Sequence, residues 1–509
     1  MNRPLEAFAA AVSAIRGRLS VVAGQSERTL LLGVILLVSI FSVFRGFVLA
    51  RYFSLDVLST LVLSVPEDCL IDWPMKVGRH CFSDYSLVVG YGMRPDPWDL
   101  FPLPNSKLAH NNYSAAGMLP HMLFGSLGNL LHAPRLGLLG YLLALTAACL
   151  SPAVWAARGA RGLERFAVFM ALGVAAIPLW TAIDRGNSVG FMVPIALVFL
   201  VALCRRRWRL AAIMVVLAAL VKPQVVLLAV ALFAARQWRL GGLAVGGAAL
   251  TNLAAYLVWP SHFPTTILQS IHEALGFGSS GSSASSADVF NMSFTEGLLM
   301  IPDDIKAGET GGKIPAGFMA GPRSLLGYVV LVLVVVCIVA LGRRIQPVMV
   351  GTVLLATASL FPALVPAYYL VFALPVAALV ARNPDGPPGS GIFDRPATVG
   401  GRRRAVGLLV SLAAALTIAQ IVPIGPPLWN QAMGTGAIVP HLIGVVTSVR
   451  MAPVLWLIAC VAIIVSYARK PTPSHRGERW PYPDGSQDIA ANDSLRGVTV
   501  PTNESQPRI

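Results

Sequence analysis

The chain has 509 residues, of which 55% are hydrophobic and only 12% are charged, and its formal net charge is +15. Many separate apolar runs approach the roughly 20 residues that span a bilayer, so the composition predicts an all-α polytopic membrane protein. The basic residues form short clusters between these runs, and membrane topology explains such clusters better than nucleic-acid binding does.

Ten apolar stretches are predicted to cross the membrane completely. The arginine clusters between them should face the cytoplasm, and this rule fixes the direction of each crossing and places both termini inside. The first stretch begins too far into the chain, and lacks the small-residue cleavage site, to be a secretory signal. The predicted spans are 30–50, 136–157, 166–182, 188–204, 240–259, 325–342, 348–363, 369–381, 405–422 and 451–468.

One further apolar segment, 210–235, has basic residues at both ends and Lys222-Pro223 in its middle. A single crossing would carry one basic cluster outside, so we predict a re-entrant hairpin, which brings the total to twelve hydrophobic helices. Two arms of about 12 residues reach roughly 18 Å, past the middle of a hydrocarbon core about 30 Å thick. Lys222 would then lie at the tip, beside a cavity open to the outer face. The alternative is a single tilted span in which Lys222 snorkels or pairs with an acidic residue.

The remaining chain divides by composition. Residues 1–29 are predicted to be a cytoplasmic N-terminus, 30–468 a transmembrane catalytic domain, and 469–509 a disordered cytoplasmic tail rich in Pro and Ser. External segments are expected at 51–135, with helices along the membrane interface, and at 260–323. The second contains GFGSSGSSASSAD, which is either a lid or, as we favour, a linker.

Two of the six cysteines stand apart from the apolar spans. Cys69 and Cys81 share the first external segment, where a disulfide can persist, so we predict that they are bonded; two free thiols are the alternative. The external histidines are scattered and form no closely spaced ligand set, so no metal site is expected.

Function is expected from external polar residues that face the proposed cavity. An Asp can accept a proton from an alcohol, while a Lys or Arg can hold a phosphate leaving group whose charge grows as its bond breaks. Together these groups indicate sugar transfer from a lipid phosphate. The candidates are Asp56, Asp72, Asp84, His110, Tyr113, Asp184, Arg185, Asn187, Lys222 and Gln224.

The order of these motifs resembles a known family. An external Asp follows the first span, then come Asp-Arg-Gly-Asn-Ser, Lys-Pro-Gln in a broken apolar run, and Asn291-Met292-Ser293-Phe294 in a later external loop. This order is similar to that of the actinobacterial polyprenyl-phosphate-mannose-dependent mannosyltransferases, which belong to glycosyltransferase family 87 and have the C-type glycosyltransferase fold. The resemblance points to Asp72 as the general base, with Asp56 as its rival and Asp84 as a third possibility.

The resemblance also implies roles for other residues. Gly186-Asn187 matches a family Gly-Gln or Gly-Asn pair, and Lys222-Pro223 matches a family Lys-Pro whose Lys would hold the donor phosphate. The sequence departs from the family at Met292, where a Gln is expected, and at Tyr368, where a His is expected. The expected substrate-binding residues are Lys222, Arg185, Asn187, Gln224, Tyr113, Asn291 and Tyr368.

Each of these residues also has a purely structural interpretation. Asp184 and Arg185 could pair with each other at a turn, and Asn187 and Asn291 could cap helices, a position that Asn favours. Tyr113 and Tyr368 could belong to an aromatic belt at the membrane surface. His110 and His121 are expected at the interface rather than in catalysis.

The function that the resemblance implies is inverting transfer of mannose from a polyprenyl phosphate to an envelope glycolipid or lipoglycan. It would occur at the outer face of the plasma membrane, without metal or other cofactor. An arabinofuranosyltransferase with a lipid-phosphate pentose donor is the close alternative. A transporter of lipid-linked glycans and a non-catalytic scaffold of envelope assembly are the other classes that remain.

Overall fold

The computed structural model describes residues 26–53, 82–102, 108–109, 111–276, 291–309, 322–394, 403–421, 428–434, 437–444 and 448–471. Several predictions lie outside these residues and stay predictions. They concern Asp56, Asp72, the Cys69–Cys81 disulfide, the Ser/Gly-rich loop and the C-terminal tail.

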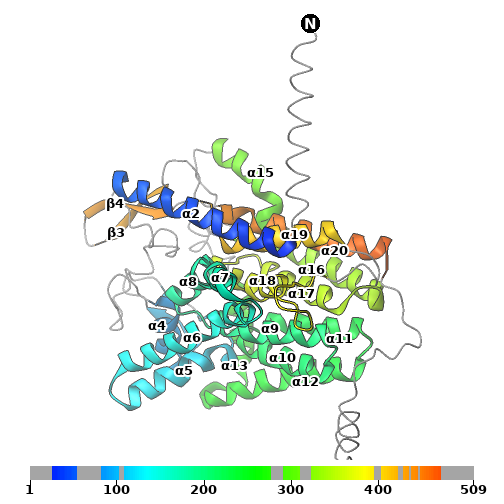
Figure 1. Cartoon of the computed structure of the whole chain (residues 1–509). Coiled ribbons are helices and arrows are strands. Elements are labelled where there is room, and N and C mark those ends of the chain that lie inside the picture. Colours follow the sequence, from blue (N-terminus) through cyan, green and yellow to red (C-terminus); the bar gives the residue numbers. More distant parts are fainter. Residues whose placement is uncertain are drawn as a thin grey trace, which may run out of the picture. The chain divides into compact units, whose positions relative to one another are not determined.

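Within the described residues, five helices are long and apolar enough to cross a membrane. They are α2 (Glu27–Phe53), α6 (Pro134–Ala157), α12 (Trp238–Ala255), α16 (Pro322–Leu341) and α20 (Ala452–Arg469) (Figure 1). The chain therefore has the features of a polytopic membrane protein, as its composition predicts.

The segment 166–182, which we predicted as one span, is bent. It consists of α7 (Gly162–Phe169), a π-helical turn η2 (Met170–Val174) and α8 (Ile177–Arg185), with a 44° bend between the two arms. Pro178 lies in the first turn of α8, where a backbone N–H has no partner within the helix. Inside one continuous helix, the same proline would cost a backbone hydrogen bond. Counted as one span, this pair is the sixth candidate.

Four other predicted spans and the predicted hairpin 210–235 coincide with shorter apolar helices of 10–17 residues, so the full count of ten spans stays a prediction. These helices are α9 (Met192–Cys204), which follows the 3₁₀ turn η3 (Ser188–Phe191), α10 (Trp208–Val221), η4 (Pro223–Ala229) with α11 (Val230–Ala234), α17 (Pro347–Leu360), η8 (Ala367–Phe372) with α18 (Ala373–Ala381), and α19 (Arg404–Ile418).

Smaller elements connect these helices. Four further helices are α4 (Ser83–Gly92), α5 (Ala115–Leu130), α13 (Thr265–Gly276) and α15 (Phe294–Glu309). Short 3₁₀ turns are η5 (Tyr256–Val258), η6 (Pro260–His262), η7 (Gly342–Arg344) and η9 (Ser448–Met451). Two small antiparallel hairpins depart from the all-helical expectation: β1 (Phe101–Pro102) pairs with β2 (Leu108–Ala109), and β3 (Leu428–Gly434) pairs with β4 (Ala437–Gly444).

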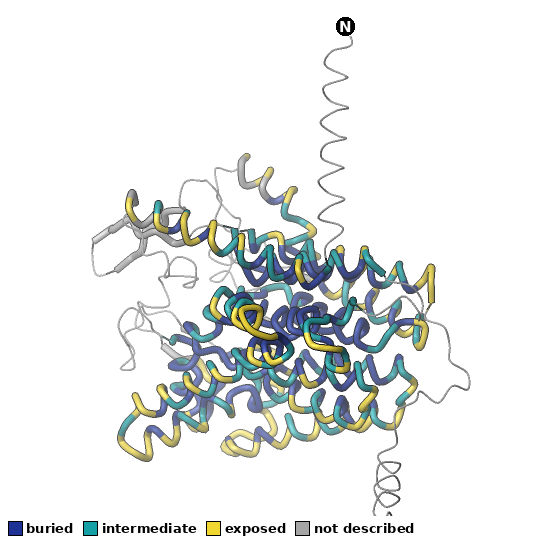
Figure 2. The backbone as a smooth tube through the Cα atoms, in the orientation of Figure 1, coloured by how far each residue is buried: buried dark blue, intermediate teal, exposed yellow. Residues whose placement is uncertain are grey.

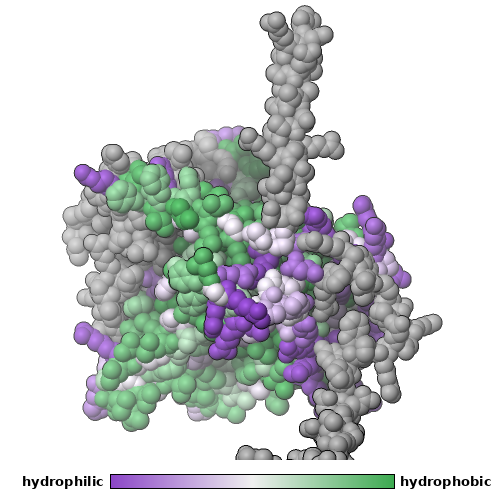
Figure 3. All heavy atoms as spheres, viewed as in Figure 1, coloured by the Kyte–Doolittle hydropathy of each residue, from purple (hydrophilic) through white to green (hydrophobic). Residues whose placement is uncertain are grey.

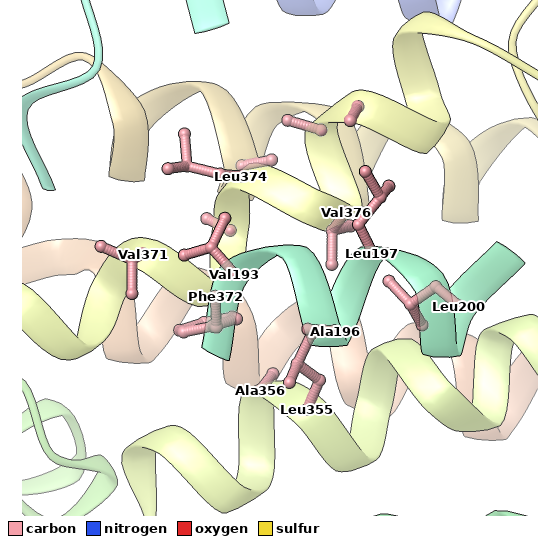
Figure 4. Packing of buried hydrophobic residues seen from close by; sticks show 14 of the residues in the cluster. Val193, Ala196, Leu197, Leu200, Leu355, Ala356, Val371, Phe372, Leu374 and Val376 are labelled. Atoms are coloured by element: carbon pink, nitrogen blue, oxygen red, sulfur yellow. The ribbon is translucent and has the colours of Figure 1, made fainter. Parts of the chain in front are cut away.

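The core is built on the short apolar helices. In Figure 4, Val193 and Leu197 of α9 lie between Leu355 of α17 and the α18 side chains Leu374 and Val376. Every residue of α18 is buried, which explains why a helix too short to span a bilayer can be apolar on all sides. Figure 2 shows buried residues concentrated in these inner helices and exposed ones on the outer helices.

The outer helices expose large apolar side chains. Leu37 and Phe44 of α2 are 69% and 66% exposed, and Leu333 of α16 is 58% exposed. Hydrophobic residues cover much of the face drawn in Figure 3. Contiguous apolar surface of this kind is expected where a helix faces lipid rather than water.

Three helix ends with arginines lie together. Arg205, after α9, donates from Nε to Asp385 Oδ1 at 2.8 Å, and Arg382, after α18, donates to the carbonyl of Trp155 near the end of α6 at 2.6 Å. Arg28, at the start of α2, donates from Nε to the carbonyl of Ala381 at 2.7 Å. These contacts agree with the prediction that the basic clusters beside these helices share one side.

The predicted break at Lys222-Pro223 is confirmed. α10 ends at Val221, and Lys222 has an extended backbone (φ −143°, ψ 110°) before η4 begins. α10 packs beside α12, with Val216 next to Gly247 and Ala219 next to Asn252, so the two helices run in parallel. Because α12 runs in the same direction as α10, the chain must come back to the start of α10 before α12 begins. The η4–α11 segment makes this return, so the backbone folds back as the re-entrant prediction requires.

Candidate functional site

Asp84 is the centre of a cluster of buried polar side chains. It lies in the first turn of α4, and only 7% of its surface is exposed. Asn187 donates from Nδ2 to Asp84 Oδ2 at 2.6 Å, and Arg185 donates to Oδ1 at 3.2 Å. Both carboxylate oxygens therefore have donors, which a buried carboxylate requires.

A tight turn presents Arg185 and Asn187 to Asp84. α8 ends at Gly186, whose backbone is left-handed (φ 63°), and Asn187 N–H bonds back to the carbonyl of Ala182 at 3.0 Å. Glycine is favoured at this position of a helix end because it adopts positive φ without strain. A Cβ on Gly186 would also lie 2.9 Å from the Cβ of Tyr85.

Asn187 has two functions at once. Its Oδ1 accepts from the N–H of Val189 at 2.9 Å and caps η3, as the structural interpretation expects. This bond fixes the amide orientation, so Nδ2 points to Asp84 and also donates to the hydroxyl of Tyr113 at 2.8 Å. The same orientation of the Asn187 amide therefore provides both the cap of η3 and the contact with Asp84.

Lys222 enters the cluster from the break between α10 and η4. It is buried, and its Nζ lies 4.2 Å from the ring centroid of Tyr113 and 5.4 Å from that of Tyr369. A cation over aromatic rings is stabilised by their quadrupoles. Lys222 therefore faces the same polar cluster as Asp84, and the alternative of a snorkelling side chain is not observed.

The protonation of Asp84 reflects these neighbours. Burial raises the pKa of this carboxyl, while the Asn187 hydrogen bond and the charge of Lys222 lower it in part, and the result is about 6. Burial also raises the pKa of Tyr113 well above its usual value of 10, so its phenol stays protonated. A carboxyl that titrates near neutral pH is suited to accept a proton during a reaction.

Tyr368 and Tyr369 of η8 form another wall of the cluster. Their rings stack at 5.3 Å, and the guanidinium carbon of Arg185 lies 6.0 Å from the ring centroid of Tyr368. The structure thus brings together Arg185, Asn187, Lys222, Tyr113 and Tyr368, which the sequence singled out.

Two other expected substrate-binding residues have different surroundings. Asn291 lies before α15, where its Nδ2 donates to the carbonyl of Ala363 at 2.8 Å and its Oδ1 accepts from the N–H of Val365 at 2.9 Å. It therefore ties its loop to the segment that precedes η8, so its observed contacts are structural. Gln224 is half-buried in the first turn of η4, and its side chain makes no hydrogen bond within the described part of the chain.

The structural interpretation, in which Asp184 and Arg185 pair only with each other, does not hold for Arg185, because its guanidinium contacts Asp84. Asp184 is buried. No group of three or more His, Cys, Asp or Glu side chains that could hold a metal occurs within the described ranges.

His121, which the sequence analysis expected at the membrane interface, instead supports the site from a buried position. It is fully buried in α5, and its Nε2 lies 3.1 Å from the carbonyl of Gly186. Tyr141 of α6 donates its hydroxyl to the same carbonyl at 2.9 Å, and its ring stacks on His121 at 5.0 Å. Burial lowers the pKa of His121 to about 3, so the imidazole is neutral. His121 and Tyr141 thus hold the turn that carries Arg185 and Asn187.

Comparison with known protein families gives a match over part of the chain. Residues 118–342 match the family model described as Glycosyltransferase family 87. This region contains Arg185, Asn187 and Lys222, whereas Asp84 and Tyr113 precede it. No curated protein and no solved structure matches the chain.

Proposed function

We propose that the protein is a membrane glycosyltransferase that moves a mannosyl residue from a polyprenyl phosphate to a glycolipid or lipoglycan at the outer face of the plasma membrane. The match to a glycosyltransferase family over 118–342 supports the class of reaction. The observation that carries the proposal is the convergence of a buried carboxylate, Asp84, with Lys222 and Arg185.

Asp84 is our choice for the general base. The sequence favoured Asp72, with Asp56 second, but among the described residues Asp84 is the carboxylate that contacts both Arg185 and Asn187. Its pKa of about 6 leaves it mostly ionised at neutral pH, and a base with a pKa close to the working pH transfers protons efficiently.

The proposed reaction is a single displacement. An acceptor hydroxyl gives its proton to Asp84 as its oxygen forms a bond to the anomeric carbon. The bond from that carbon to the phosphate oxygen breaks on the opposite face, and polyprenyl phosphate leaves with the electron pair. The configuration inverts, so a β-linked donor gives an α-linked product.

Lys222 and Arg185 are proposed to stabilise the leaving phosphate. Its negative charge grows as the bond breaks, and a fixed cation in a site of low polarity stabilises that charge more than water does. The ammonium of Lys222 lies near the rings of Tyr113 and Tyr369, which stabilise its charge inside the cluster. In this role the two cations supply the electrostatic stabilisation of the reaction.

The test uses the full-length protein in lipid vesicles with radiolabelled polyprenyl-phosphate mannose and envelope glycolipid acceptors. Asp84→Asn should lower the initial rate by roughly 10²-fold or more, because it removes the base and keeps the shape. Asp385→Asn is the matched control: this carboxylate pairs with Arg205 at the cluster of arginine-bearing helix ends, and its loss should leave the rate near wild type.

The same assay separates the alternatives. If Asp84→Asn transfers like wild type while Asp72→Asn or Asp56→Asn does not, the base lies in that other residue. A lipid-phosphate arabinofuranose donor, supplied in parallel, distinguishes the pentose activity. A wild-type protein that transfers neither sugar would contradict the proposed function.

A further inference from the structure

Two turns at the opposite end of α10 from Lys222 have the same sequence pattern. Arg206-Arg207-Trp208-Arg209-Leu210 joins α9 to α10, and Arg236-Gln237-Trp238-Arg239-Leu240 joins α11 to α12. Each reads Arg, a polar residue, Trp, Arg, Leu, with the Trp as the first residue of the next helix.

The backbones of the two turns also match. Arg206 and Arg236 both have left-handed backbones, with φ of 53° and 60°. The N–H of Arg207 bonds to the carbonyl of Ala202, and the N–H of Gln237 bonds to that of Leu232, each at 2.8 Å. This helix ending normally takes Gly or Asn, so an arginine in both turns is better explained by its side chain than by its backbone.

The packing of α10 on α12 places the turns side by side. The two helices run parallel, with Val216 beside Gly247 and Ala219 beside Asn252. The first residues of the two helices, Trp208 and Trp238, therefore lie at the same end of the pair. Over the 14 residues of α10, these tryptophans lie roughly 20 Å from Lys222 and therefore away from the candidate active site.

The paired turns form a basic surface at the end of a candidate membrane span. The side chains of Arg206, Arg209, Arg236 and Arg239 are exposed, and Trp238 is 61% exposed at the first residue of the span Trp238–Val258. No Asp or Glu occurs in the sequence between Asp184 and Glu273. The nearby Asp385 pairs with Arg205, which precedes the first turn.

We infer that these two turns bind the headgroup phosphates of anionic phospholipids of the membrane in which the protein lies. Arginines present planar donors that match phosphate oxygens, and tryptophan at the end of a span lies at the level of the headgroups. Basic groups between helices at the membrane surface attract anionic headgroups, whereas a zwitterionic headgroup would gain much less.

The experiment measures lipid binding by native mass spectrometry of the full-length protein, with phosphatidylglycerol and phosphatidylcholine added separately. Wild type should retain phosphatidylglycerol in preference. Arg209→Gln/Arg239→Gln should reduce this preference roughly tenfold, because one charge is lost from each turn. Arg161→Gln/Arg165→Gln is the control: it removes two exposed arginines beside and within α7 and should keep the wild-type preference.

Arg209→Lys/Arg239→Lys keeps the charge and should retain most of the binding, which separates loss of charge from loss of folding. Equal retention of the two lipids by wild type would overturn the inference. An equal loss of the phosphatidylglycerol preference in the Arg161→Gln/Arg165→Gln control would also overturn the inference. The attraction would then belong to the whole charged face and not to the paired turns.

Discussion

Asn187 donates one amide hydrogen to Asp84 and the other to the hydroxyl of Tyr113, while its oxygen caps η3. The amide therefore connects the proposed base to an aromatic ring that also contacts Lys222. Because the cap fixes which way the amide points, the donor to Asp84 is in place before any substrate binds.

Substitution Asn187→Asp tests this connection. The new carboxylate keeps the cap acceptor but removes the donor to Asp84 and puts a like charge beside it, which raises the pKa of Asp84 above about 6. The transfer rate should fall at least tenfold at pH 7 and recover in part as the pH rises. A pH–rate profile with the same acidic limb as wild type would contradict this role. Asn252→Asp, an amide between α10 and α12, is the control.

The pH dependence of the wild type follows from the same carboxyl. The ionised form is the active one, so the transfer rate should increase about tenfold per pH unit below pH 6 and level off above it. The stability of the folded protein should change with pH in the opposite direction. Because folding raises this pKa, Asp84 favours the folded state at low pH, and that contribution is lost as the pH rises from about 4 through about 6. Initial rates and thermal unfolding over pH 4.5–8, with Asp84→Asn in parallel, measure both effects.

Lys222 is predicted to act through its charge on the donor phosphate. Lys222→Met keeps most of the apolar stem and removes the cation, so the transfer rate should fall by roughly 10²-fold. Lys222→Arg keeps the charge and should retain a measurable part of the rate, although the guanidinium differs in size and geometry from the ammonium. Rates measured over a range of donor concentrations check this. Equal rates for the Met and Arg variants would contradict a role for charge.

The sequence predicted the parts of this site that local patterns reveal. A lysine and a proline within an apolar run are conspicuous, and both the break at Lys222 and its place in the cluster followed from them. Arg185 and Asn187 were likewise found from a short polar motif. The sequence favoured Asp72 over Asp56 and Asp84 from its likeness to the family layout. The contacts that support Asp84 as the proposed base join it to Arg185 and Asn187, about 100 positions further along the chain, so no local pattern reveals them.

Other differences have the same origin. His121 lies on an apolar helix with no local signal, and its function of holding Gly186 depends on Tyr141 from another helix. The bend before α8 had a readable signal, Pro178, which the predicted span 166–182 passed over. The shortness of α17 and α18 is a packing property, since both are enclosed by other helices, and hydropathy alone does not distinguish enclosure from lipid.

Gly186 is predicted to be indispensable for the geometry of the turn. In Gly186→Ala the methyl group must occupy a left-handed backbone and would lie 2.9 Å from the Cβ of Tyr85, so the turn has to shift. We expect a loss of about 1–2 kcal/mol in unfolding free energy. The transfer rate should fall at least tenfold, because Arg185 and Asn187 move away from Asp84.

Gly246→Ala provides the matched control for that variant. Gly246 lies inside α12 with nothing within 4 Å of an added Cβ, so alanine there should be neutral or stabilise the helix by up to about 1 kcal/mol. Thermal unfolding in detergent and transfer rates in vesicles measure both variants. If Gly186→Ala unfolds and transfers like Gly246→Ala, the turn tolerates a side chain, and its left-handed geometry is not what positions Asn187 against Asp84.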